Sequence, residues 1–163
     1  RIYTNGYLFE EKPRERKLNI AAVEELEIDR CYYQNIKNGK DFLLESGKLI
    51  PNDQLTFDAV APMKYAFCSD TMYDESIISL IHEVDVLYHE TTFLEAEADK
   101  AEKTMHSTAI QAATIAKKAN VKNLILGHYS TRYSSIEFFK NEAETVFSKV
   151  LLADDGKSFD FEN

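Results

Sequence analysis

The sequence contains few cysteines, and this scarcity excludes two classes of protein. Only Cys31 and Cys68 occur among its 163 residues. A zinc finger or zinc ribbon needs closely spaced pairs of ligands, which two distant cysteines do not provide. A small domain held together by several disulfides is excluded as well, so we expect reduced thiols and a cytoplasmic protein.

Long apolar runs and an excess of positive charge are also lacking. No apolar stretch approaches the roughly 18 residues that a membrane-spanning helix needs. The contents of 44% hydrophobic and 29% charged residues are typical of a globular domain. The formal net charge of −9 disfavours a general nucleic-acid-binding surface, because such surfaces neutralise phosphates with Lys and Arg. A compact site in which metal ions supply the positive charge is compatible with this composition.

Several motifs that mark well-known active sites are missing from the sequence. It has no glycine-rich phosphate loop, no G-x-S-x-G nucleophile elbow and no H-E-x-x-H zinc motif. Any chemistry must therefore be carried by residues in a different arrangement.

Three short apolar runs each end at residues that can bind a metal or carry a proton. These are 65–68 before Asp70, 85–88 before His89 and Glu90, and 124–127 before His128. Helical spacing of Ile77, Leu80 and Ile81 after the first run predicts a helix, which favours an α/β fold with parallel strands. Ligands bind at the carboxyl ends of such strands, so we expect these side chains to share one edge. Carboxylates and imidazoles are zinc ligands and proton carriers.

The rest of the pattern predicts short helices and hairpins around this sheet. Helices are expected over 21–28, 107–118 and 136–147, and hairpins over 41–50 and 149–161. Ser107 is expected to cap the second of these helices. The segment 95–103 is helix-prone but polar, so we expect a solvent-facing, mobile connection.

Each candidate residue also has an ordinary structural interpretation. Asp70 is of the type that caps a helix, His89 and His128 can be hydrogen-bonded histidines at strand ends, and Glu90 can be a surface carboxylate. Their occurrence at equivalent strand ends favours a functional interpretation. His106 stands at the start of a predicted helix, where pairing with Glu90 would favour its protonated form and make it a general acid.

Four motifs occur in an order and spacing that we can compare with a known family. They are Ser69-Asp70-Thr71, His89-Glu90-Thr91-Thr92-Phe93-Leu94, His106-Ser107-Thr108-Ala109 and Gly127-His128-Tyr129-Ser130-Thr131-Arg132-Tyr133. Together with the segment 6–13, they resemble the C-terminal half of ribonuclease Z, a zinc-dependent endonuclease that trims the 3′ trailer from precursor tRNA. The resemblance covers essentially the whole chain. It implies that residues 1–163 are the C-terminal part of a metallo-β-lactamase fold, an αβ/βα sandwich.

Carried over by position, the resemblance implies roles for eight residues. The metal ligands are Asp70 and His128, the catalytic residues are Glu90, His106 and His89, and the substrate-binding residues are Ser130, Arg132 and Tyr133. The implied mechanism is two-metal phosphodiester hydrolysis, with Asp70 bridging two zinc ions. His106, tuned by Glu90, would protonate the departing ribose 3′ oxygen.

The sequence also departs from the family pattern. The His-x-His-x-Asp-His signature, which supplies most of the zinc ligands, is absent. Thr91 stands where the family commonly has alanine, and Thr131 where serine is common. The resemblance therefore implies a piece of a longer enzyme that is not competent alone, binds zinc weakly or not at all, and self-associates as a homodimer through uncovered apolar strands.

Two other functions are compatible with the same residues. One is a metallo-β-lactamase-fold phosphodiesterase or arylsulfatase-like hydrolase that acts on small esters. The other is a non-catalytic assembly module whose exposed half-core binds a partner chain.

Overall fold

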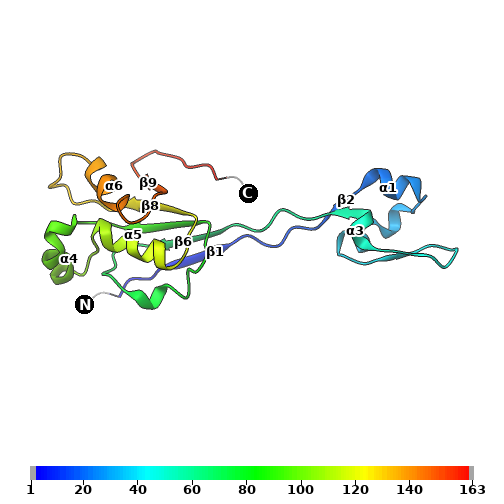
Figure 1. The fold of residues 1–163 in the computed structure, drawn as a ribbon, viewed down its shortest axis with the longest axis horizontal. Helices are drawn as coiled ribbons and strands as arrows, with labels where there is room; N and C mark the ends of the chain where they lie inside the picture. Colours follow the sequence, from blue (N-terminus) through cyan, green and yellow to red (C-terminus); the bar gives the residue numbers. More distant parts are fainter. Residues whose placement is uncertain (1–2, 162–163) are drawn as a thin grey trace. The chain divides into compact units, whose positions relative to one another are not determined.

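The computed structural model describes residues 3–161, which divide into two compact units (Figure 1). One unit contains residues 3–10 and 63–161, and the other contains residues 11–62. The sequence pattern gave no sign of this division.

The first unit is built on a five-stranded sheet with the strand order β1-β6-β7-β8-β9. Its strands are β1 (Tyr7–Glu10), β6 (Lys64–Cys68), β7 (Val86–Glu90), β8 (Asn123–Gly127) and β9 (Val150–Leu152). Strand β1 is antiparallel to β6, and the other pairs are parallel. The three predicted strands are therefore neighbours, and their carboxyl ends lie at the same edge, as expected.

Helices α5 (Ala109–Lys118) and α6 (Glu137–Ala143) pack on one face of this sheet (Figure 1). Thr108 caps α5 in place of the expected Ser107: its side chain accepts from Gln111 N–H, and the Gln111 side chain accepts from Thr108 N–H. Small side chains let α5 approach the strands closely. Its fully buried residues are Ala109, Ala112, Ala113, Ile115 and Ala116.

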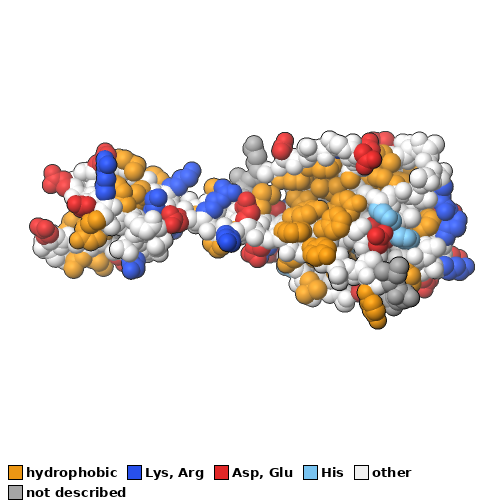
Figure 2. Space-filling model, turned by 180° about the vertical axis from the view of Figure 1, so that it is seen from behind, with side chains coloured by type: hydrophobic (Ala, Val, Ile, Leu, Met, Phe, Trp, Pro, Cys, Tyr) orange, Lys and Arg blue, Asp and Glu red, His pale blue; other side chains and the backbone are white. Residues whose placement is uncertain are grey.

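The opposite face of the sheet is apolar and open. The strand register places Tyr7 beside Phe67 and Phe67 beside Tyr88 on this face, and Phe9 beside Tyr65. Phe67 stacks on Tyr88 with ring centroids 4.7 Å apart, yet Tyr7 and Phe9 are each 56% exposed. Seen from behind, apolar side chains form a broad patch over this unit (Figure 2). Exposed apolar patches of this kind mark surfaces that bind another protein segment.

The connection between β6 and β7 differs from the predicted helix. It contains only the 3-10 turn η2 (Glu75–Ile77) before the chain bends toward β7. Glu83 has a positive φ of 57°, and its N–H donates to the Ala119 carbonyl at 2.8 Å instead of continuing a helix. The backbone hydrogen bonds of this segment therefore go to the end of α5, which overrides the local apolar spacing.

The polar segment after β7 is anchored, contrary to the expected mobile connection. It forms η3 (Glu95–Glu97) and α4 (Ala98–Thr104). Ala101 is fully buried, and Glu97 accepts hydrogen bonds from Arg132 and Tyr133. The terminal hairpin predicted over 149–161 is also absent, because β9 pairs in parallel with β8 and residues 158–161 form no strand.

The second unit, residues 11–62, is a small helical unit with two short strand pairs. Its elements are β2 (Lys17–Leu18), α1 (Ile20–Glu25), η1 (Arg30–Tyr32), α2 (Tyr33–Lys37), β3 (Phe42–Leu43), β4 (Leu49–Ile50), α3 (Asn52–Leu55) and β5 (Thr56–Phe57). Strand β2 pairs with β5 and β3 with β4, so the hairpin predicted over 41–50 is confirmed. The predicted early helix is confirmed as α1, capped by Asn19. Buried Asn52 donates to the carbonyls of Ile36 and Lys40 at 2.7 and 2.8 Å and thereby ties α3 to α2 and to the chain after it.

Both cysteines are free, as the sequence led us to expect. Burial raises the pKa of the Cys68 thiol to about 11, which keeps it protonated and unreactive at neutral pH. None of the helices between residues 3 and 161 has the length and apolar character that crossing a membrane requires.

Candidate active site

The two predicted metal ligands meet at the carboxyl edge of the sheet. Asp70 follows β6, His128 follows β8, and His128 Nε2 lies 2.9 Å from Asp70 Oδ1. Both residues have positive φ, 50° for Asp70 and 61° for His128. This backbone conformation is uncommon for residues other than glycine, and Asp and His are among the side chains that adopt it more readily.

His106 reaches the same edge from the end of α4. Met105 ends that helix with a φ of 66°, and His106 N–H donates to the Ala101 carbonyl at 2.8 Å. The turn directs the imidazole toward Glu90 at the end of β7. His106 Nδ1 lies 2.9 Å from Glu90 Oε1, which confirms the predicted pairing of these side chains.

Glu90 is fully buried and accepts hydrogen bonds at both carboxylate oxygens. Oε1 accepts from His106 Nδ1 and, at 3.0 Å, from Ser107 N–H. Oε2 accepts from the N–H and the hydroxyl of Thr92, each at 2.9 Å. A buried carboxylate is tolerated when its lone pairs are satisfied in this way. Hydrogen bonds to both oxygens therefore fix the Glu90 carboxylate, and the carboxylate in turn fixes the imidazole ring of His106.

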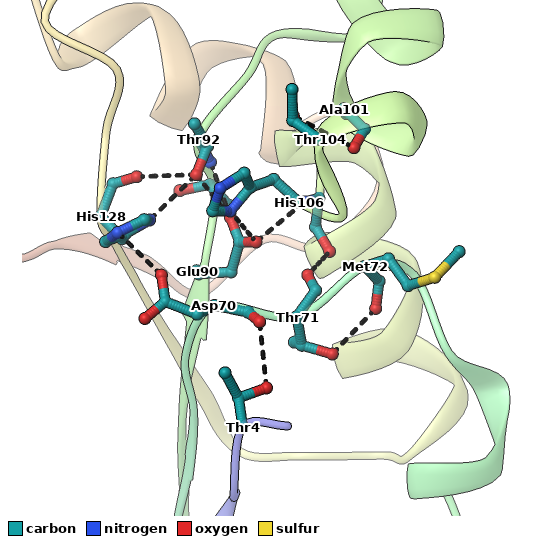
Figure 3. A network of polar contacts seen from close by, with 12 residues as sticks. Thr4, Asp70, Thr71, Met72, Glu90, Thr92, Ala101, Thr104, His106 and His128 are labelled. Atoms are coloured by element: carbon teal, nitrogen blue, oxygen red, sulfur yellow. Dashed lines mark hydrogen bonds and ion pairs between the residues drawn. The ribbon is translucent and has the colours of Figure 1, made fainter. Parts of the chain in front are cut away.

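Thr92 connects the two histidines, a role that sequence reasoning missed. Its hydroxyl oxygen lies 2.9 Å from Glu90 Oε2 and 2.9 Å from His128 Nδ1. Figure 3 shows Thr92 between the side chains of Glu90 and His128, with His106 and Asp70 facing the same space. The available signal was a hydroxyl residue two positions after Glu90, where a strand end turns toward the sheet edge.

The donor atoms at this edge suit a zinc ion. Asp70, His106 and His128 each offer a ligand atom, and these atoms lie within 4.8 Å of one another. Two imidazole nitrogens and one carboxylate oxygen are a ligand set that zinc accepts. The donor types present therefore fit the implied metal, and His106 lies near enough to the other donors that its predicted role as a proton donor must be separated from a role as a metal ligand.

Comparison with known proteins identifies the relatives of this chain. No family model matches the sequence. Ribonuclease Z of Parabacteroides distasonis is 47% identical over 156 residues, which are 96% of this chain and 51% of that protein. Ribonuclease Z of Porphyromonas gingivalis is 44% identical over 160 residues, 98% of this chain and 53% of that protein. The chain is a ribonuclease Z homologue. It spans about half the length of the relatives that it matches.

Solved structures show the fold to which this ribonuclease Z homologue belongs. The metallo-β-lactamase fold protein YhfI from Bacillus subtilis matches with a TM-score of 0.55 and 27% identity, covering 58% of this chain and 39% of that one. A long form RNase Z from yeast matches with a TM-score of 0.51 and 28% identity, covering 58% and 13%. The chain has an α/β metallo-β-lactamase fold over part of the length of these proteins.

In this ribonuclease Z homologue, His89 is not brought to the candidate ligands Asp70, His106 and His128. It pairs in register with Cys68 and Leu126, whereas its neighbour Glu90 points to the other side of the strand. The His89 ring is fully buried, its Nδ1 lies 2.8 Å from the Glu90 carbonyl oxygen, and its Nε2 has no hydrogen-bond partner within residues 3–161. Burial lowers the pKa of His89, which favours the neutral ring, and its side chain lies on the opposite side of the strand from Glu90.

The predicted substrate-binding residues form a hydrogen-bonded group with Glu97, made of Ser130, Arg132 and Tyr133. One guanidinium nitrogen of Arg132 donates to both Glu97 oxygens at 2.8 and 2.9 Å, and its Nε donates to the Ser130 hydroxyl. Tyr133 donates its hydroxyl to Glu97 at 2.8 Å and accepts from Leu94 N–H. Hydrogen bonds from Tyr133, Lys100 and Arg132 lower the pKa of Glu97 to about 2. These contacts tie the loop after His128 to η3.

An open cavity of about 820 Å³ adjoins the cluster of the ribonuclease Z homologue. Asp70 and His106 lie in its wall, which places the candidate proton donor and a candidate ligand at the same opening. Its other lining residues are Tyr3, Thr4, Thr71, Met72, Tyr73, Asp74, Thr104 and Met105. This volume is within the range of small-molecule pockets in proteins.

Proposed function

We propose that this chain is the C-terminal half of a zinc-dependent endoribonuclease that removes the 3′ trailer from precursor tRNA. The observation that carries the proposal is the His106–Glu90 pair beside the Asp70–His128 pair at one edge of the sheet. The identity to ribonuclease Z over nearly the whole chain supports the substrate class.

The metal would be held by Asp70 and His128, with the remaining ligands supplied by the part of the protein outside this chain. When bound, zinc supplies positive charge that stabilises the scissile phosphate and promotes ionisation of water. Each proposed ligand extends from a strand end, and the two donor atoms lie 2.9 Å apart, so they are close together before a metal binds.

His106 would act as the general acid for the leaving group. As the phosphorus–oxygen bond breaks, Nε2 gives its proton to the 3′ oxygen of the departing tRNA end. The His106 side chain is 24% exposed, which gives substrate access to the ring, while Glu90 is fully buried and holds Nδ1. A positioned general acid contributes about 10²–10⁴-fold to a rate.

Ser130, Arg132 and Tyr133 would border the substrate. While Arg132 is hydrogen-bonded to Glu97, they would not bind its phosphates. Glu97 holds the Arg132 guanidinium in two hydrogen bonds, so contact with a phosphate requires an exchange of partners. We propose that Ser130, Arg132 and Tyr133 line the tRNA end after such an exchange. In this scheme Glu97 keeps the arginine oriented until RNA arrives.

The open aromatic face of the sheet would be covered in the working enzyme. We propose that the rest of the αβ/βα sandwich packs against it, and that the enzyme is a cytoplasmic homodimer. Expressed alone, the chain would self-associate through this face, and light scattering measures that directly. A chain that stays monomeric at high concentration would contradict this part of the proposal, whereas stable binding to an unrelated protein would favour the assembly-module alternative.

The experiment that tests the function compares two substrates of the full-length protein that contains this chain. We expect cleavage of a precursor tRNA at the 3′ end of the acceptor stem to be far more efficient than hydrolysis of bis(p-nitrophenyl) phosphate. The alternative, a phosphodiesterase for small esters, is favoured by the engagement of Arg132 with Glu97. Efficient hydrolysis of the small ester without tRNA cleavage would establish that alternative and reject the proposal.

A further inference from the structure

We propose that Thr92 is a positioning residue that sets His128 in one ring orientation and one protonation pattern. The inference rests on the metal-binding role proposed for His128. Thr92 can take this role because its one buried hydroxyl contacts both the Glu90 carboxylate, which holds His106, and the imidazole of His128 (Figure 3).

The direction of each hydrogen bond follows from counting protons. The Thr92 hydroxyl has one proton and three possible acceptors, Glu90 Oε2 at 2.9 Å, His128 Nδ1 at 2.9 Å and the His128 carbonyl at 3.2 Å. Hydrogen bonds to a charged carboxylate are the stronger, so the proton goes to Glu90. With that proton on the Glu90 side, the 2.9 Å contact with His128 Nδ1 is a hydrogen bond only if Nδ1–H donates to the hydroxyl oxygen.

This bond fixes which nitrogen of His128 is available to a metal. With Nδ1–H donating to Thr92, Nε2 is the nitrogen left for a metal, and it is the atom that lies 2.9 Å from Asp70. Without a metal this contact is made by a proton on Nε2, which a bound metal would replace. Thr92 is only 9% exposed, so water competes poorly for the hydrogen bond. The β-branched side chain adds stiffness, because few χ1 rotamers are allowed.

The same contacts define a clean substitution. Thr92 N–H donates to Glu90 and its carbonyl accepts from Ser130 N–H at 3.1 Å, and both backbone bonds persist in Thr92→Val. Valine has nearly the shape of threonine, so the change removes the hydroxyl alone. Thr92→Ser restores the hydroxyl without the methyl group.

Thr91 provides a matched control. It is the adjacent threonine, is fully buried, and directs its hydroxyl to the Gly127 carbonyl at 3.2 Å, away from either histidine. Thr91→Val therefore removes a buried hydroxyl from the same segment with a comparable cost in stability. An effect on His128 that is specific to Thr92 must be absent from this variant.

The experiment measures His128 in two ways in the full-length protein. The first is a proton–nitrogen NMR spectrum of histidine-labelled protein, with and without zinc. We expect a slowly exchanging Nδ1 proton on His128 in the wild type, Thr92→Ser and Thr91→Val, and its loss in Thr92→Val. The second is zinc affinity by competition with a chelator. We expect a 10–100-fold loss in Thr92→Val, as for other groups that orient ligands, and at most a threefold change in the other two.

The outcomes separate this inference from the proposed function. A wild-type His128 protonated on Nε2 alone, or a Thr92→Val variant with an unchanged Nδ1 proton and zinc affinity, would overturn the role of Thr92. The wild-type spectrum decides even if the valine variant fails to fold. A wild-type protein that binds no zinc would reject the proposed metal site, while the spectrum would still report on Thr92.

Discussion

Replacement of Glu90 by glutamine tests how strongly the buried network holds the site together. The carboxylate accepts four hydrogen bonds, two at each oxygen. An amide has one oxygen and one NH₂ group. In Glu90→Gln the NH₂ group replaces one carboxylate oxygen, so its two hydrogens face groups that are themselves hydrogen-bond donors. The Thr92 hydroxyl can turn to accept from the amide, but the N–H of Thr92 or of Ser107 is then left without an acceptor.

The expected cost follows from these contacts. An unsatisfied buried donor costs about 1–3 kcal/mol, and the surviving bonds lose the strengthening that a charged acceptor provides. We therefore expect Glu90→Gln to lower the free energy of unfolding by about 2–5 kcal/mol, a large part of the roughly 5–15 kcal/mol of a typical domain. Glu144→Gln is the control, because Glu144 is exposed and pairs with Lys140 only at 3.8 Å. Its expected effect is within about 0.5 kcal/mol.

Urea unfolding followed by far-ultraviolet circular dichroism measures this difference. The midpoint should shift for Glu90→Gln with little change in the slope, and the control should overlay the wild type. A Glu90→Gln variant within about 1 kcal/mol of the wild type would show that the four bonds do not hold a buried carboxylate, and the reasoning about the site would fail with it.

Three further predictions concern packing, pH and the thiols. A Cβ on Gly127 would lie 2.3 Å from the Tyr88 hydroxyl oxygen, so Gly127→Ala should destabilise by about 1–3 kcal/mol in urea, and should cost less in a Tyr88→Ala background. The pKa of Glu97 is lowered from 4.5 to about 2, so its contribution to stability should be complete above pH 4.5 and disappear as the pH falls through 2; urea unfolding of Glu97→Gln should lack this dependence, and an unchanged dependence would contradict it. A thiol reagent at pH 8 should modify one cysteine per native chain, the exposed Cys31, because Cys68 is buried with a pKa of about 11; rapid reaction of two would contradict the buried position.

The strands and the main site residues were predictable because their signals are local. An apolar run that ends at Asp70 or His128 marks a strand end, and parallel neighbours bring such ends together. The His106–Glu90 contact was predictable from the resemblance, and the structure confirms it at 2.9 Å. The orientation of His89 was also predictable from the sequence. Adjacent residues of a strand point to opposite faces, so the side chains of His89 and Glu90 cannot both face the site.

Other features depend on partners that are distant in the sequence. From the sequence alone, Arg132 is interpreted as a phosphate ligand. Its pairing with Glu97 was not predicted, because no local sequence pattern near either residue indicates it. The helix predicted before β7 does not form for the same reason, a partner distant in the sequence: the Glu83 N–H donates to a carbonyl at the end of α5. Thr92 was overlooked because a threonine at a strand end is ordinary until its two neighbours are placed.

The most direct test of the central claim measures zinc content and tRNA cleavage together in His106→Ala of the full-length protein. His106 lies within 4.8 Å of the other candidate ligand atoms, so its role as a proton donor must be separated from a role as a metal ligand. We expect a cleavage rate lower by about 10²–10⁴-fold with zinc content unchanged. A parallel loss of zinc and of activity would make His106 a metal ligand and contradict its role as the general acid.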